Sequence, residues 1–380
     1  MRDYVEIGIG REARKTYHLS SIALVPSRRT RSSKDVDTTW NIDAYTFDIP
    51  VVAHPTDAIV GPEFAIEMHN QGGLAVLNAE GLWARHADVE AALARVVAAA
   101  EDSDHFFLGE EVTQATRVLQ ELHSAPIDEE LLVERITQIR ESGATVAVRV
   151  SPQNARDLAP VLVKAGVELL FIQGTQISAE HVQQGGEPLN LKEFIGSLDV
   201  PVIAGGVSDY TTALHLMRAG AAGIIVGSGD TTSDTALGIS TPMATAIADA
   251  AAARREYLDE TGGRYVHVIA DGEINLSGDI ARAIACGADA VMLGSPLTYA
   301  EEATGDGYYW QSSAAHPRFP RGVVIREADS AERESLEVVL HGPSADALGT
   351  KNLVGGLRRA MAKCGYTDVK SFQKVKLALR

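Results

Sequence analysis

Two strand ends in the second half of the chain carry residue types that suit phosphate binding. A short apolar run ends at Asp271-Gly272, and after a helical pattern a second apolar run ends at Gly294-Ser295. Glycine lets backbone N–H groups approach an anion without interference from a Cβ atom. A (β/α)₈ barrel builds its phosphate pocket across its last two strands in this way, so the spacing predicts an anion pocket. An Asp-Gly pair after a strand also occurs in ordinary turns, so the pair alone does not establish a phosphate site.

Eight such apolar runs, separated by helical patterns, must position these groups. They cover residues 49–53, 73–77, 146–150, 169–172, 200–204, 223–226, 265–270 and 290–293. Continuous apolar runs are typical of parallel strands that are buried on both faces. We therefore expect an α/β fold, a closed (β/α)₈ TIM barrel, with an open doubly wound sheet as the alternative.

An internal repeat supports the barrel. Glycine closes the helical pattern before the second, fourth, sixth and eighth expected strands, at Gly72, Gly166, Gly220 and Gly287. A helix end often turns through positive φ, which glycine adopts without strain. The repeating unit is therefore a pair of strands with their helices.

Three segments depart from the repeat, and we expect all of them to belong to a single domain, residues 1–380. Residues 78–145 hold at least two extra helices, near 89–100 and 128–141. Residues 227–235, after the sixth expected strand, are rich in small hydroxylated and acidic side chains. Residues 300–350 carry Tyr308-Tyr309-Trp310 and are expected to form a lid or a subunit contact.

Composition excludes several classes of function. A formal charge of −17 argues against a nucleic-acid or anionic-membrane surface, because both need a basic face. No apolar run approaches the roughly 18 residues that cross a bilayer, and the N-terminus lacks a signal peptide's apolar stretch, so we expect a cytoplasmic protein. The histidines show no metal-ligand spacing, and we predict no metal site.

An ordered set of motifs resembles the IMP dehydrogenase and GMP reductase family, nearly from end to end. More narrowly it resembles the actinobacterial IMP dehydrogenase-related group, which lacks the regulatory CBS modules. Residues 78–145 stand where those modules would be inserted. The motifs are Leu24-Val25-Pro26, Ile49-Pro50-Val51-Val52, Asp57, Gln71-Gly72-Gly73, Gly205-Gly206, Pro242-Met243-Ala244-Thr245-Ala246, Ala270-Asp271-Gly272, Leu293-Gly294-Ser295 and Leu353-Val354-Gly355-Gly356-Leu357-Arg358.

The resemblance implies a purine mononucleotide ligand, NAD as cofactor and a fourfold-symmetric homotetramer. Asp271 would hold the ribose hydroxyls. The phosphate would be bound by backbone N–H groups at Gly206, Ser228, Gly229, Gly272, Gly294 and Ser295. The nicotinamide would lie against Gln173, Gly174 and Thr175, where the family's acidic residue is replaced by Gln173.

The family's reaction needs a cysteine after the sixth strand to attack the purine, and here that position is Thr231. A threonine hydroxyl needs an adjacent strong base, and the nearby carboxylates are poor bases toward an alcohol. Cys286 precedes the eighth strand and Cys364 lies in the last long helix, so we expect both to be packing residues. The sequence therefore predicts a lost or altered oxidoreductase activity.

Other departures agree with this prediction. Glu273 replaces the second glycine after Asp271, so it stands at a nucleotide-binding position, and its carboxylate would repel a phosphate unless the side chain turns away. Pro320 replaces a tyrosine before Arg321, and the flap lacks the Arg-Tyr pair that activates water. His54 and Asp57 stand where the family has a serine and an aspartate that approach the nucleotide, so the resemblance implies that His54 binds it. The alternative, favoured because His54 has no evident partner, is a histidine at the barrel rim.

Three functions remain open from the sequence. The first is a purine-nucleotide binder of this family that has lost or altered its oxidoreductase activity. The second is an active NAD-dependent IMP dehydrogenase or GMP reductase. The third is an interaction scaffold that binds no small molecule.

Overall fold

The eight predicted strands form one closed parallel barrel. The computed structural model describes residues 3–101, 113–181, 189–229, 232–318 and 322–380. The barrel closes because the last strand pairs with the first, Leu293 opposite Ala53. This closure confirms the barrel and excludes the open sheet. The barrel strands are β6 (Val51–Ala53), β7 (Leu74–Asn78), β8 (Ala147–Val150), β9 (Leu169–Gln173), β12 (Val202–Val207), β13 (Gly223–Gly227), β14 (His267–Asp271) and β15 (Ala290–Leu293).

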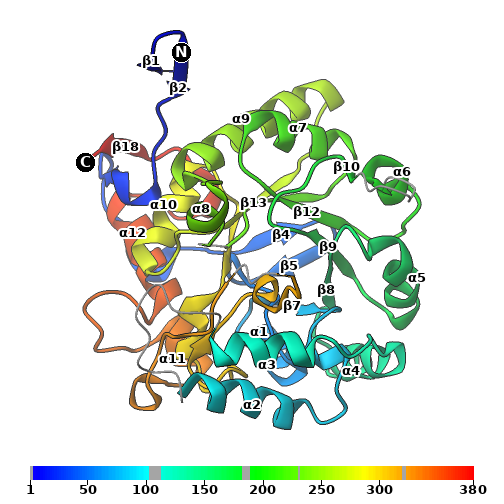
Figure 1. The fold of residues 1–380 in the computed structure, drawn as a ribbon. Coiled ribbons are helices and arrows are strands. Elements are labelled where there is room, and N and C mark those ends of the chain that lie inside the picture. Colours follow the sequence, from blue (N-terminus) through cyan, green and yellow to red (C-terminus); the bar gives the residue numbers. More distant parts are fainter. Residues whose placement is uncertain (1–2, 102–112, 182–188, 230–231, 319–321) are drawn as a thin grey trace.

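Helices surround the barrel (Figure 1). Apolar side chains fill both the space between helices and strands and the barrel interior, where Phe171, Ile225 and Met292 pack together. The helices are α1 (Pro62–Asn70), α2 (Val89–Glu101), α3 (Gln114–Leu122), α4 (Glu129–Glu141), α5 (Ala155–Ala165), α6 (Leu191–Gly196), α7 (Tyr210–Arg218), α8 (Thr232–Leu237), α9 (Met243–Thr261), α10 (Ser277–Cys286), α11 (Leu336–His341), α12 (Leu353–Cys364) and α13 (Val369–Phe372).

The repeated glycines act at helix ends as the sequence predicts. Gly72, Gly166, Gly220 and Gly287 have φ values of 84°, 100°, 104° and 124°. Side chains other than glycine are strained in this region, and the turn lets each chain segment re-enter the barrel.

A short hairpin closes the N-terminal end of the barrel. Its strands are β4 (Trp40–Ile42) and β5 (Tyr45–Phe47), and Trp40 and Phe47 stack with ring centroids 5.4 Å apart. Both side chains belong to the same apolar cluster as the barrel interior. The open end that remains is therefore the C-terminal end of the strands, where barrel proteins bind ligands.

A second hairpin has the opposite character. Its strands β1 (Tyr4–Gly8) and β2 (Arg11–Arg14) project away from the barrel (Figure 1). Ile7 and Ile9 are exposed, and the hairpin contributes no buried core. Other short pairs are β3 (Ile22–Val25) with β18 (Lys376–Leu379), β10 (Glu180–His181) with β11 (Leu189–Asn190), and β16 (Tyr308–Tyr309) with β17 (Ile325–Arg326).

Residues 78–145 are helical, as expected, with one addition. Within residues 78–145 the structure forms α2 and α4 close to the predicted bounds and α3 between them. The aromatic residues 308–310 do not form a surface patch. Tyr308 and Trp310 are buried in the core, and Tyr309 lines a cavity. These aromatic side chains stabilise the excursion from within.

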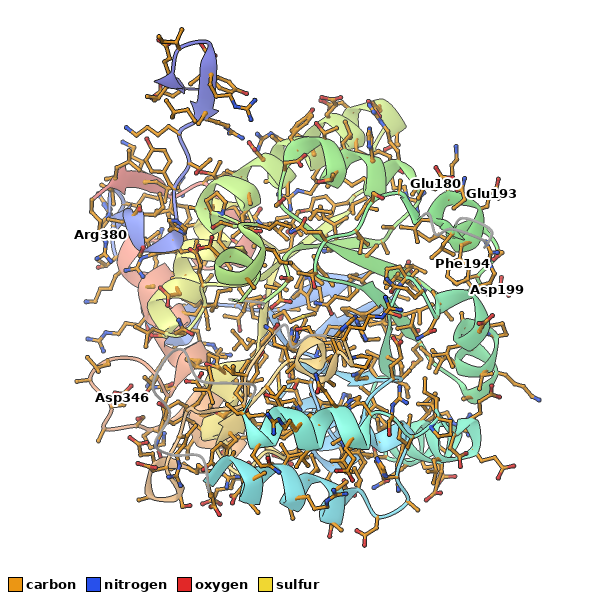
Figure 2. The ribbon with its side chains drawn as sticks, viewed as in Figure 1. Glu180, Glu193, Phe194, Asp199, Asp346 and Arg380 are labelled. Atoms are coloured by element: carbon orange, nitrogen blue, oxygen red, sulfur yellow. The ribbon has the colours of Figure 1, made fainter. Side chains whose placement is uncertain are left out.

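Asp346 organises the loop after α11, at the edge of the fold (Figure 2). Burial would raise the pKa of its carboxyl, but hydrogen bonds from Leu348, Thr350 and Lys351 outweigh burial and lower it to about 2. A lowered pKa stabilises the fold above the unfolded value near 3.8 and loses that contribution as pH falls toward 2. We expect Asp346→Asn to cost about 1 kcal/mol at pH 7 after allowing for solvent screening.

Urea unfolding of both proteins between pH 7 and pH 3 measures this effect. The difference between Asp346→Asn and the unchanged chain should shrink steadily below pH 4. A difference that stays constant over this range would contradict the role of the Asp346 carboxylate.

Candidate functional site

A buried polar group lies at the C-terminal end of the barrel. The Oδ2 atom of Asp271 accepts a hydrogen bond from Gln173 Nε2 at 2.9 Å and lies 3.1 Å from Nδ1 of His54. All three residues are at least nine-tenths buried. A buried carboxylate is costly unless it is hydrogen-bonded, and these two partners fix its position.

Strand register explains why these three residues meet. Asp271 ends β14, Gln173 ends β9, and His54 follows β6 with its N–H donating to Leu293 O at 2.8 Å. In a parallel barrel all strands end on the same face, so side chains from distant strands converge there. The sequence predicts no partner for His54 and a cofactor contact for Gln173. The structure joins both side chains to Asp271, and the cofactor contact stays a prediction.

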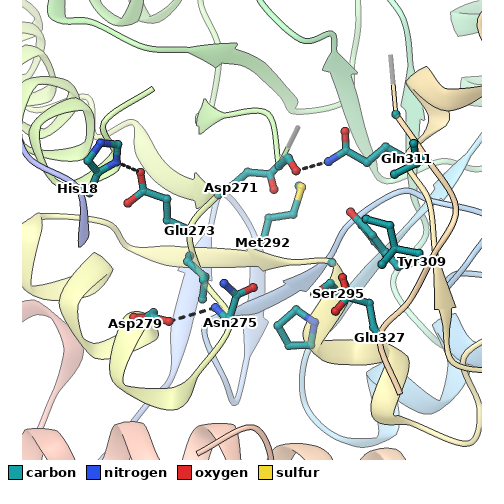
Figure 3. Close-up of a pocket in the computed structure, with 18 of the residues that line it drawn as sticks. His18, Asp271, Glu273, Asn275, Asp279, Met292, Ser295, Tyr309, Gln311 and Glu327 are labelled. Carbon is teal, nitrogen blue, oxygen red and sulfur yellow. Dashed lines mark hydrogen bonds and ion pairs between the residues drawn. The ribbon is translucent and has the colours of Figure 1, made fainter. Parts of the chain in front are cut away.

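A cavity of about 730 Å³ lies beside this carboxylate (Figure 3). Among the residues predicted to bind nucleotide, Gly229, Asp271, Gly272, Glu273, Gly294 and Ser295 line it. A Cβ atom on Gly294 would lie 2.5 Å from the Tyr309 hydroxyl, so glycine is needed for the aromatic ring to close this wall. The volume is in the range of small-molecule sites.

The remaining predicted phosphate contacts lie elsewhere or are engaged. The N–H of Gly206 donates to Gly174 O at 2.8 Å, and Gly206 does not line the cavity. The N–H of Gly229 donates to Asp271 O at 2.9 Å. Ser228 lines an adjoining hollow of about 200 Å³. Thr231 lies outside the described residues, as do Pro320 and Arg321.

Residues 310–316 cross the barrel mouth as a strap. Thr56 donates to Trp310 O, Gln311 donates to Gly229 O, and Asn78 donates to the Ser312 hydroxyl at 3.1 Å. Gln120 donates to His316 O at 2.7 Å. These bonds come from different parts of the chain, so the strap is fixed by tertiary contacts. Part of the predicted lid therefore lies over the mouth.

A second cavity of about 770 Å³ lies on the other side of the strap, and Gly174 and Thr175 line it. A hollow of about 50 Å³, lined by His54 and Gln173, lies beside Gln311 and Ser312 of the strap. The Oε1 atom of Gln173 has no hydrogen-bond partner among the described residues.

The second cavity contains an ion pair that the sequence did not predict, between Glu80 and Arg149. Glu80 Oε2 lies 3.2 Å from NH1 of Arg149, and NH2 of Arg149 donates to Gln173 O at 2.7 Å. Burial lowers the pKa of Arg149. A charged residue within the apolar run 146–150 is the sequence signal that could have revealed this pair, because buried charges need partners.

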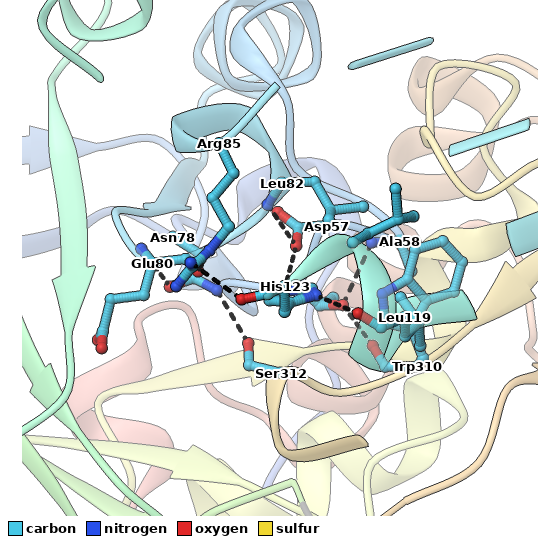
Figure 4. Close-up of polar contacts among 12 residues, drawn as sticks. Asp57, Ala58, Asn78, Glu80, Leu82, Arg85, Leu119, His123, Trp310 and Ser312 are labelled. Carbon is cyan, nitrogen blue, oxygen red and sulfur yellow. Dashed lines mark hydrogen bonds and ion pairs between the residues drawn. The ribbon is translucent and has the colours of Figure 1, made fainter. Parts of the chain in front are cut away.

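Asp57 lines neither of these cavities. Its Oδ2 accepts from Leu82 N at 3.0 Å and lies 3.7 Å from Nε2 of His123 (Figure 4). It therefore fixes the loop after β7, although its place in the sequence matches that of a family aspartate that approaches the nucleotide.

Both cysteines of the chain lie away from the cavity beside Asp271. Cys286 ends α10, whose C-terminus leads to the N-terminal end of β15, and burial raises the pKa of its thiol to about 12. Cys364 is buried at the end of α12. A thiol with a raised pKa holds little reactive thiolate at neutral pH.

The described ranges contain neither a cluster suited to a metal ion nor a membrane-spanning helix. No cluster of three or more histidine, cysteine, aspartate or glutamate side chains there could hold a metal ion. No helix in the same ranges is long and apolar enough to span a membrane.

Comparisons with known proteins agree with this geometry. The family model for the IMP dehydrogenase / GMP reductase domain matches residues 16–379. An uncharacterized oxidoreductase of Mycolicibacterium smegmatis is 64% identical over 99% of both chains, and one of Mycobacterium leprae is 63% identical over 98% of this chain and 99% of its own. Inosine-5'-monophosphate dehydrogenase of Aquifex aeolicus is 33% identical over 57% of this chain and 46% of its own length.

A solved structure is similar over the whole chain. The crystal structure of an IMP dehydrogenase/GMP reductase-like protein from Corynebacterium glutamicum is 66% identical, with a TM-score of 0.93. It covers 100% of this chain and 98% of its own. These findings confirm the family resemblance, and this chain belongs to the IMP dehydrogenase / GMP reductase family.

Proposed function

We propose that this protein binds a purine nucleoside or nucleotide without forming the covalent intermediate of its family. The observation that carries this proposal is the carboxylate of Asp271, fixed by Gln173 and His54 beside a cavity of about 730 Å³. A carboxylate held in this way accepts hydrogen bonds from a pair of ribose hydroxyls. Gly272, Gly294 and Ser295 line the same cavity and stay predicted contacts of the ligand.

The positions of the thiols support a non-covalent role. Covalent catalysis needs a nucleophile within bonding reach of the purine, and both cysteines are distant from Asp271 in the fold. That Thr231 is an inactive replacement of the family's cysteine stays a prediction. Homotetrameric assembly and a cytoplasmic location also stay predictions.

An active NAD-dependent oxidoreductase is the second candidate. The cavity of about 770 Å³ has room for a dinucleotide, and Gly174 and Thr175 line it. The unpaired Oε1 of Gln173, which lines the hollow of about 50 Å³ beside the strap, is an acceptor of the kind that a carboxamide N–H requires. The residues present therefore fit a nicotinamide, which Gln173, Gly174 and Thr175 would hold. NAD would supply a hydride acceptor there, while Arg149 holds the backbone of Gln173 in place.

Two measurements test the proposal. Pure protein incubated with IMP and NAD⁺, or with GMP and NADPH, should show no change in the absorbance of the reduced nicotinamide. Titration calorimetry should show saturable binding of inosine, guanosine or their monophosphates. Robust turnover would overturn the proposal in favour of the oxidoreductase, and turnover that survives Thr231→Ala would also exclude a hydroxyl nucleophile. Absence of any binding would favour a scaffold.

A further inference from the structure

The cavity beside Asp271 is strongly acidic (Figure 3). Asp271, Glu273, Asp279 and Glu327 all line it. Among the described residues that line it, the only side chain that can become positively charged is His18. A phosphate monoester carries nearly two negative charges at pH 7, so this lining repels it.

A carboxylate of the protein accepts from the N–H groups that lead into α10, the helix after β14. Asp279, in the first turn of α10, accepts from the N–H groups of Asn275 and Leu276 at 3.2 and 3.1 Å. Its other oxygen accepts from NH1 of Arg282 at 2.7 Å. Barrel phosphate sites use backbone N–H groups near a helix start. Here two of the N–H groups just before the helix already bind a carboxylate.

Glu273 also contacts donors of the protein, and one of them belongs to His18. Its Oε1 lies 2.5 Å from Nδ1 of His18, and its Oε2 accepts from Leu19 N at 2.8 Å. The side chain is therefore turned toward residues 18–19. This orientation reduces its own repulsion of a ligand, but it also uses two donors that an anion would need.

Glu327 adds a further carboxylate on the opposite wall, beside Ser295 (Figure 3). It is half-buried, and burial raises the pKa of its carboxyl, while the nearby Ser295 hydroxyl lowers it in part. Ser295, predicted to bind phosphate, therefore lies next to a carboxylate.

We propose that this cavity takes an uncharged purine nucleoside or base rather than a nucleoside 5'-monophosphate. The inference rests on the proposed function and specifies its ligand class. Carboxylates accept hydrogen bonds from ribose hydroxyls and ring N–H groups. The described lining therefore offers several charged acceptors to a neutral ligand, and no lysine or arginine to an anion.

Titration calorimetry at low ionic strength tests the inference with two matched pairs, inosine with IMP and guanosine with GMP. At least one nucleoside should bind about 10-fold more tightly than its monophosphate, and added salt should narrow the difference because it screens the repulsion. Equal or tighter binding of the monophosphates would overturn the inference and leave the proposed function standing. Absence of binding by all four compounds would overturn both.

Charge-neutralising variants provide the second test. Glu273→Gln and Glu327→Gln should each raise the affinity for the monophosphate about 10-fold and so narrow the preference for the nucleoside. Glu121→Gln removes an exposed carboxylate whose partner is Arg95, outside the cavity, and should change neither affinity. Thermal unfolding checks that each variant is folded. Unchanged monophosphate affinity in both cavity variants would contradict the inference.

Discussion

Replacement of Asp289 by alanine is expected to lower the free energy of unfolding by about 3–5 kcal/mol. Asp289 lies just before β15, at the N-terminal end of the barrel, and its side chain is 5% exposed. One oxygen lies 2.5 Å from NH1 of Arg254 and accepts from Val268 N at 2.9 Å. The other accepts from the Tyr265 hydroxyl at 2.6 Å and from Lys370 Nζ at 2.9 Å.

The size of this effect follows from what remains after the substitution. Arg254 is also buried, so Asp289→Ala leaves a guanidinium with no carboxylate to balance it. Asp289 also ties Lys370, near the C-terminus, to the barrel. Several donors therefore lose one acceptor at once, and buried donors without partners are costly.

Urea unfolding at fixed protein concentration measures the loss. Glu121→Gln is the matched control, because the pair of Glu121 with Arg95 is at least half exposed and such pairs contribute at most about 1 kcal/mol. The double variant Arg254→Met with Asp289→Asn should recover part of the loss, since it removes the unbalanced charge. A double variant as unstable as the sum of its single changes would contradict this explanation.

Replacement of Asp271 by asparagine is expected to weaken binding of a purine nucleoside by about 10- to 100-fold. Hydrogen bonds to a charged acceptor contribute about 1.5–3 kcal/mol, and asparagine keeps the size of the side chain while removing the charge. His54 and Gln173 both contact the Oδ2 atom of Asp271, so the change also removes the group that orients them.

Asp57→Asn is the control for this prediction. Asp57 is a buried aspartate at the same end of the barrel, but its carboxylate contacts Leu82 and His123 outside the nucleoside cavity. The Asp57→Asn variant should be less stable and should bind the nucleoside with unchanged affinity. The Asp271→Asn variant should bind the nucleoside more weakly even where it is fully folded. Calorimetry and thermal unfolding separate the two effects. Equal affinities for the two variants would show that Asp271 does not contact the ligand.

The sequence by itself determined the barrel and the location of the site. Apolar runs and glycines at helix ends are local signals, since the periodicity of a strand and a turn through positive φ depend on neighbouring residues. Because parallel strands all end on one face, the sequence also placed Asp271, Gly294 and Ser295 together. The prediction that Thr231 stands in place of the family's cysteine likewise needed no structure.

Only the tertiary structure decided which groups pair at that face. His54 lies 217 residues from Asp271 along the chain, and His18 lies 255 residues from Glu273. Side-chain pairs this far apart depend on closure of the barrel and on the path of the N-terminal segment, and no periodicity encodes them. The same holds for the strap at residues 310–316 and for the carboxylates that accept from backbone N–H groups. The sequence therefore predicted an anion pocket, whereas the tertiary structure lines the cavity with four carboxylates. Three of them, Asp271, Glu273 and Asp279, accept hydrogen bonds from donors of the protein.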